Sequence, residues 1–169
     1  MSKNIITLGL SAILGSSTEL ASAEGAFVED GYTNFGKTYE GTAKLTQEDG
    51  EETEFYSEEN DDPEEVITKE GKTTLEFAIM DPSLEVIARL FGSEVATDVW
   101  AYPDAVADKE ESIIVKPRKG LSFHIARGRI KAKFNAAFSK KEIVLIEVKV
   151  TALKPTNSGV AKMYIKKLA

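Results

Sequence analysis

The longest strand pattern in the chain is 142-EIVLIEVKVT-151, in which every second residue is apolar: Val144, Ile146, Val148 and Val150. Successive side chains of a strand point to opposite faces, so this alternation places one apolar row on a single face. The other face begins with Ile143 and Leu145 and turns polar at Glu147. We therefore predict a strand over 142–151 that is covered on both faces for part of its length.

The same two-residue period recurs along the chain and predicts further strands over 73–80, 121–126, 129–136 and 160–166. One segment breaks it. Asp81 can cap a helix that has Pro82 at its first position and stops at Gly92. Its apolar residues at helical spacing are Leu84, Ile87 and Phe91. We predict a mainly β chain, a β-sandwich or barrel with one short α-helix at about 81–92, an extended N-terminal segment and a long acidic loop.

The length and composition are those of an ordinary globular protein. A chain of 169 residues, 42% hydrophobic and 29% charged, can bury a core as a single domain over 1–169. It contains no cysteine, which excludes disulfides, thiol nucleophiles and thiolate metal sites. Packing and hydrogen bonding must therefore hold the fold.

Charge is distributed unevenly along the chain. Residues 1–115 carry 7 basic and 26 acidic side chains, a net of −19, whereas residues 116–169 carry 14 and 2, a net of +12. Two interpretations are open. The two halves can interleave in space and cancel, or they can form separate surfaces that steer association with a partner.

The densest charge lies in residues 47–65, which hold 11 carboxylates and no basic residue, with Phe55 and Tyr56 among them. So many like charges repel one another and do not favour packing against the chain's own body. We predict an interaction arm at about 47–65 that orders on a neighbouring molecule, with the two aromatic residues as its apolar anchors.

Motifs for chemistry are lacking. His124 lies in a strand pattern without a local nucleophile or orienting carboxylate, which favours a structural histidine. The carboxylates of 58–65 lack the alternate spacing and turn glycine of a calcium loop. The basic row Arg129, Lys131 and Lys133 has no aromatic residue on its own face for bases to stack on. We predict no enzymatic activity, no cofactor and no metal.

The order of elements from Gly36 to Gly92 resembles the tail tube (major tail) proteins of long-tailed bacteriophages, whose fold is shared with the tube proteins of contractile injection and type VI secretion machines. The resemblance covers about a third of the chain, and the C-terminal strands match only in kind. It depends on GKTY at 36–39, TEFY at 53–56, NDDP at 60–63, GKTTLEF at 71–77 and the helix that Gly92 ends.

The resemblance implies a structural virion protein. Six subunits would form a ring whose sheets join into one inner barrel, and rings would stack head to tail into a tube. DNA would pass through the tube without specific binding, because an acidic lumen repels a polyanion. The expected partners are further copies of the chain and other tail proteins, with assembly in the host cytoplasm and a final place in the virion tail.

The N-terminus supports an alternative. Lys3, the apolar run 5–14 and Ala21-Ser22-Ala23 imitate a secretory signal, although Thr7, Gly9 and Ser11 dilute the run. On this interpretation the chain is a secreted or surface β-sandwich binding module. No other segment approaches the roughly 18 apolar residues that a membrane span needs, so we predict no membrane partner.

Two sets of contacts between subunits are expected. The acidic arm should meet basic residues of an adjacent subunit, and the candidates are Phe55, Tyr56, Glu58, Glu59, Asp61, Asp62, Arg118, Lys119, Arg127 and Arg129. The strands around 72–79 and 142–151 contain no proline to protect an edge, so we expect them to pair with neighbouring subunits.

Overall fold

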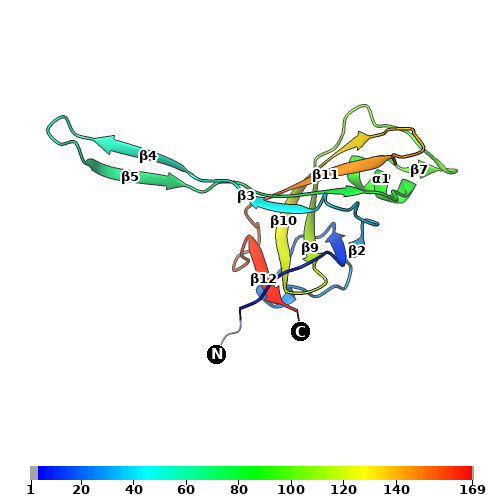
Figure 1. Cartoon of the computed structure of the whole chain (residues 1–169), viewed down its shortest axis with the longest axis horizontal. Coiled ribbons are helices and arrows are strands. Elements are labelled where there is room, and N and C mark those ends of the chain that lie inside the picture. The colour runs from blue at the N-terminus through cyan, green and yellow to red at the C-terminus, as the bar shows by residue number, and fades with distance from the viewer. Residues whose placement is uncertain (1–3, 169) are drawn as a thin grey trace.

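Residues 4–168 form an antiparallel β-structure with one short α-helix, which confirms the predicted fold class. A computed structural model describes residues 4–168 (Figure 1). The elements are β1 (Ala12–Ser16), a 3-10 turn at Ala23–Gly25, β2 (Thr33–Asn34), β3 (Lys44–Gln47), β4 (Glu51–Tyr56), β5 (Pro63–Lys69), β6 (Thr73–Ile79), α1 (Leu84–Phe91), β7 (Val95–Ala96), β8 (Val99–Trp100), β9 (Lys109–Lys116), β10 (Leu121–Asn135), β11 (Leu145–Ala152) and β12 (Met163–Lys167).

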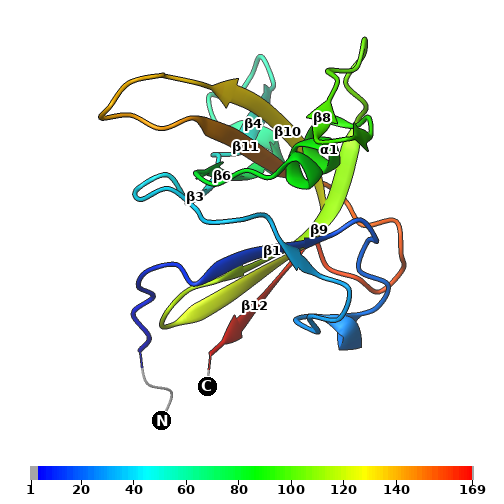
Figure 2. The same cartoon turned by 90° about the vertical axis from the view of Figure 1, so that its right-hand side faces the viewer.

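One sheet carries most of the structure. Its strand order is β2-β1-β9-β10-β11-β6-β3, and β12 pairs with β10 beside this path. Figure 2 shows the sheet folded into two layers, with β1, β9 and β12 in one and β3, β6 and β11 in the other. β10 belongs to both layers, because its first half pairs with β9 and β12 and its second half with β11.

The two strands expected at 121–126 and 129–136 are one strand. The apolar residues switch from odd to even positions between Ile125 and Ile130, which suggests a break in the sequence pattern. In the structure the β9–β10 register shifts between Ile125 and Gly128, so that β10 has one residue more than β9. This bulge turns Ile125 and Ile130 toward the same core.

The core lies between the two layers. Rows of inward side chains meet across the strands, as where Val150 pairs with Leu75 and Val148 with Phe77. β6 is buried on both faces except at Glu76. The strands expected to be free edges, β6 and β11, each have a partner on both sides, so that expectation is wrong. The lack of proline in β6 and β11 fits central strands, because a central strand has to donate backbone N–H groups to partners on both sides and proline has none to donate.

Helix α1 begins two residues later than the sequence indicates. Ser83, not Asp81, is the N-cap, and its side chain accepts a hydrogen bond from the Val86 amide at 3.2 Å. Asp81 instead accepts from the Lys37 amide at 2.6 Å. The helix ends at Gly92, which has a φ of 89°, as predicted.

Arg89 attaches the helix to the sheet. Its Nε donates to Glu111 of β9 at 2.8 Å, its Nη1 donates to the Thr33 hydroxyl at 2.8 Å, and its guanidinium lies 4.0 Å from the centre of the Phe35 ring. Burial raises the pKa of Glu111, and the hydrogen bond from Arg89 opposes that rise. The pair therefore holds the charged carboxylate in a buried position.

We predict that Leu75→Ala lowers the free energy of unfolding by roughly 2–5 kcal/mol, because a leucine 1% exposed leaves a cavity in the core. The adjacent Glu76→Ala, on the solvent side of the same strand, is the matched control and should change it by less than about 0.5 kcal/mol. Urea denaturation of both variants measures the difference. Equal losses would contradict the assignment of faces in β6.

Candidate assembly surfaces

The acidic segment is a two-stranded hairpin that projects from the body (Figure 1). β4 and β5 pair only with each other, and every residue of both strands is exposed. The predicted long loop at 47–65 is therefore a β-hairpin, and it extends to Lys69. We call residues 48–71 the arm.

The pairing register explains how so acidic a segment forms strands. The opposed pairs are Glu51–Lys69, Glu52–Thr68, Thr53–Ile67, Glu54–Val66, Phe55–Glu65 and Tyr56–Pro63. No pair sets one carboxylate against another. Like charges directly opposite each other destabilise a ladder, so this register separates the repelling groups while the β-branched and aromatic residues favour the strand.

Both faces of the arm carry exposed apolar side chains. Phe55 and Ile67 share one face and are 51% and 53% exposed, while Tyr56 and Val66 lie toward the other and are 56% and 45% exposed. The Tyr56 hydroxyl donates to Glu54, which raises the pKa of Tyr56. The predicted anchors are thus accessible on an arm that is stabilised only by its own pairing.

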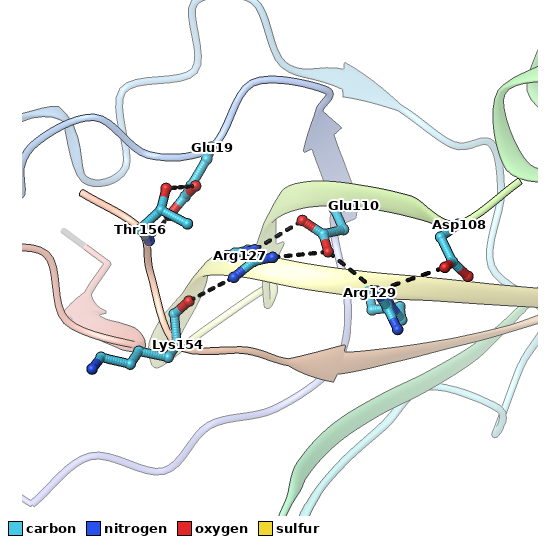
Figure 3. A network of polar contacts seen from close by, with 7 residues as sticks. All are labelled: Glu19, Asp108, Glu110, Arg127, Arg129, Lys154 and Thr156. Atoms are coloured by element: carbon cyan, nitrogen blue, oxygen red, sulfur yellow. Dashed lines mark hydrogen bonds and ion pairs between the residues drawn. The ribbon is translucent and has the colours of Figure 1, made fainter.

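Two of the predicted basic contacts are already engaged within the subunit (Figure 3). Arg127 donates to both carboxylate oxygens of Glu110, at 2.8 and 3.0 Å, and to the carbonyl of Lys154 at 3.0 Å. Arg129 lies 3.5 Å from Glu110 and 3.8 Å from Asp108. The hydrogen bond from Arg127 lowers the pKa of Glu110. Arg127 and Arg129 thus already have carboxylate partners within the subunit, and their contact with an arm stays a prediction.

Arg118 and Lys119 remain open candidates. Within residues 4–168 neither forms an ion pair, and the Arg118 side chain lies over Gly9. The carboxylates Glu58, Glu59, Asp61 and Asp62 lie at the tip of the arm, and none of them is in an ion pair there either. The structure does not bring these two groups together within one subunit.

The body interleaves its charge, as one of the two interpretations expects. Six of the eight ion pairs among residues 4–168 join the acidic first part of the chain to the basic last part, for example Lys116–Glu29, Lys149–Glu76 and Lys162–Glu70. The arm is the exception: its eleven carboxylates at 48–65 form no ion pair among residues 4–168, and Glu70 at its base pairs with Lys162. The unbalanced charge is concentrated there.

The N-terminal apolar run is part of the sheet. Leu8 and Lys119 exchange two backbone hydrogen bonds, of 2.9 and 3.2 Å, and β1 pairs with β9. Ile13 is 1% exposed and belongs to the core. Cleavage after Ala23, which the secreted-module interpretation requires, would remove β1 and Ile13 from the fold.

Residues 4–168 contain no group of three or more His, Cys, Asp or Glu side chains placed to hold a metal ion. No helix in this part of the chain is long and apolar enough to cross a bilayer.

Comparison with known protein families finds one match, to the phage tail tube proteins, over residues 11–169. The chain belongs to this family. Comparison with curated proteins finds no match. The family assignment makes the chain a structural component of a virion tail. The matched residues of this tail tube protein include both β1 and the arm.

Some features of these surfaces could not be found in the sequence. The carboxylate run indicated an arm, but its strand register and two-faced apolar pattern appear only once β4 and β5 are paired. The pairing of Arg127 with Glu110 joins residues that are 17 positions apart on adjacent strands. The sequence around Arg127 does not indicate Glu110 as its partner, and the sequence around Glu110 does not indicate Arg127.

His124 of the tail tube protein is buried and hydrogen-bonded on both ring nitrogens. Nδ1 accepts from the Phe27 amide at 3.0 Å, and Nε2 lies 2.7 Å from the Ser112 hydroxyl and 3.1 Å from that of Tyr32. The Phe27 contact assigns the proton to Nε2 in a neutral ring. Burial lowers the pKa of His124 to about 4, and the expected structural histidine is confirmed.

We predict that acidification destabilises the subunit through His124. Its pKa is about 4 in the folded state and 6.5 when unfolded, so the unfolded chain binds the extra proton between these values and stability falls as pH falls. The loss should be roughly 2 kcal/mol between pH 7 and 5. Urea titrations of the dilute subunit measure it, and His124→Gln should flatten the slope whatever its absolute stability. An unchanged slope in that variant would contradict the assignment.

Proposed function

We propose that this tail tube protein is a non-enzymatic, self-assembling subunit that forms six-membered rings, stacked head to tail into a conduit for DNA ejection. The subunits would assemble in the host cytoplasm, join other tail proteins and function in the virion tail. The observation that carries the proposal is the arm, an ordered hairpin with exposed apolar residues and unneutralised charge. No residue of this hairpin belongs to the hydrophobic core of the subunit.

The reach of the arm suits contact between subunits. From Glu48 to the turn at Asn60 the chain advances twelve residues, or roughly 40 Å at strand spacing. A body of about 150 residues is itself roughly 40 Å across. The arm of one subunit can therefore lie along the whole of an adjacent body. Because arm and body are different surfaces, such contacts are head-to-tail and repeat indefinitely or close into a ring.

Passage of DNA without specific binding is consistent with the chain's charge. The subunit carries a net charge of −7, so a tube of many copies is strongly acidic overall. Binding to nucleic acid depends on neutralising phosphates with cations, and among residues 4–168 seven of the body's cations already pair with carboxylates of the same subunit.

The first test is the size of the purified protein. Concentrated subunits should form rings or long tubes in negative-stain electron microscopy, with six subunits in each end-on ring. A secreted binding module would stay monomeric or form a small oligomer. A monomeric mass at high concentration, with no growth on added tube ends, would overturn the proposal.

We predict that Phe55→Ala with Tyr56→Ala leaves a folded subunit that assembles poorly. The two rings are exposed in the free subunit, so their loss costs the fold little, whereas buried aromatics often dominate the free energy of an interface. Light scattering should show elongation slowed at least tenfold, with unchanged urea stability. The matched control is Thr53→Ala with Thr68→Ala, which shortens polar side chains on the same hairpin. Normal polymerisation of the aromatic variant would show that Phe55 and Tyr56 do not anchor the arm.

A second prediction concerns salt. In 1 M salt the screening length falls to roughly 3 Å, so contacts between the arm and a basic surface should weaken and elongation should slow. Arg118→Glu with Lys119→Glu should slow growth at low salt, and Glu58→Lys with Glu59→Lys in the arm should restore part of it. Lys140→Glu with Lys141→Glu is the charge-matched control. Elongation that is equal at low and high salt would mean that apolar contacts drive stacking.

A further inference from the structure

The body contains a large open groove that no part of the described subunit fills. Its volume is about 1030 Å³, and it lies between the segment 7–12 on one side and the segment 36–45 on the other. The apolar side chains that line it come from both layers of the sheet: Leu10, Leu45, Leu75, Met80, Val115 and Phe123. Leu75 at its floor also belongs to the core, so the groove opens directly onto the core.

Both walls of the groove are unpaired sheet edges. Residues 8–12 pair with 116–119 on one side only, and residues 37–47 pair only with β6. β2 pairs with β1 at Leu14 and Gly15, so it covers the edge of β1 only beyond the groove. Unpaired N–H and C=O groups beside an apolar floor are the arrangement that accepts an added strand.

The charge of the groove is positive. Its lining includes the cations Lys37, Lys44 and Arg118 and one carboxylate, Glu40. No ion pair among residues 4–168 involves any of the three cations. This basic rim is therefore complementary in charge to the arm, whose eleven carboxylates at 48–65 form no ion pair among residues 4–168.

We propose that the groove receives the arm of a second copy of this chain. The proposal rests on the self-assembly proposed above and names the surface that the arm binds. The arm offers each thing that the groove lacks: strand backbone for the two edges, apolar side chains at Phe55, Tyr56, Val66 and Ile67 for the floor, and carboxylates for the rim. Of the basic candidates predicted from the sequence, Arg118 lines this groove.

The groove is not placed to receive its own arm. The arm continues from β3 and β6, which border the groove, and Figure 1 shows it pointing away from the body. Its base is a tight backbone crossing. A Cβ added at Gly71 would lie 2.0 Å from the carbonyl oxygen of Glu48, and one at Gly50 would lie 2.3 Å from that of Lys69. Only glycine allows so close a crossing at the base, and an arm that points away from its own body leaves the groove open to the arm of another subunit.

The absence of cysteine in the chain makes the contact directly testable. One batch of full-length subunit carries Thr53→Cys in the arm, an exposed residue on the same face as Phe55, and a second carries Ala43→Cys, an exposed residue in the groove lining. The two are mixed, assembled and treated with a short bis-maleimide, whose spacer tolerates a few ångströms of offset. Lys149→Cys, exposed on the outer face of β11, replaces Ala43→Cys in the control mixture.

We expect covalent dimers of the arm and groove variants at least tenfold in excess over the Lys149 control, and only after assembly. Tubes that form normally but couple no better at Ala43 than at Lys149 would overturn the groove proposal and leave self-assembly standing. Subunits that form neither rings nor tubes, the unsubstituted chain included, would overturn the proposed function itself. Equal coupling in dilute, unassembled protein would also count against the proposal, because it would show that the dimers arise from random encounters and not from the contact made in the assembly.

Discussion

The fold depends on the bend of β10 at Gly128. This strand has to serve both layers of the sheet, and the bulge between Ile125 and Gly128 lets it do so without turning its apolar residues outward. The bend also requires close packing, because a Cβ at position 128 would lie 2.4 Å from the Val150 side chain. Only glycine allows β10 and β11 to meet there. The core between the layers and the position of β12 both follow from this one site.

The same architecture leaves its seam open. A sheet that folds over from β1 to β3 can close into a barrel only if its end strands pair, and here β2 joins β1 over just two residues. The rest of the seam is the apolar groove. A subunit of a repeating assembly can tolerate such an opening, because a strand of a neighbouring subunit can pair with the open edges. A monomeric barrel would have to close them with its own strands.

Electrostatics divides the molecule into two parts. In the body, cations of the last third of the chain pair with carboxylates of the first part, and these exposed pairs each contribute little to stability. In the arm, the eleven carboxylates of residues 48–65 form no ion pair within the described structure. Because like charges repel, the carboxylates of the hairpin disfavour contact with another acidic surface and favour contact with a basic one. The arm, with twelve carboxylates and Lys69, carries a net of −11, which is more than half of the −19 of residues 1–115.

The sequence alone determined the class of the fold and the existence of an arm. Alternation at 142–151 and 73–80 reports local burial, and a single capped segment ending at Gly92 reports a helix, because both patterns follow from backbone geometry over a few residues. The run of carboxylates at 47–65 similarly indicates that the segment does not pack against the body of its own chain.

Tertiary structure decided the rest. Which strands are central, how one extra residue in β10 reverses its faces, and which carboxylate neutralises Arg127 all depend on pairs of residues distant in the sequence. The groove, too, arises where residues 7–12 and 36–45 come to lie across from each other. Such pairings are set by the register of the whole sheet, and no single strand contains that information.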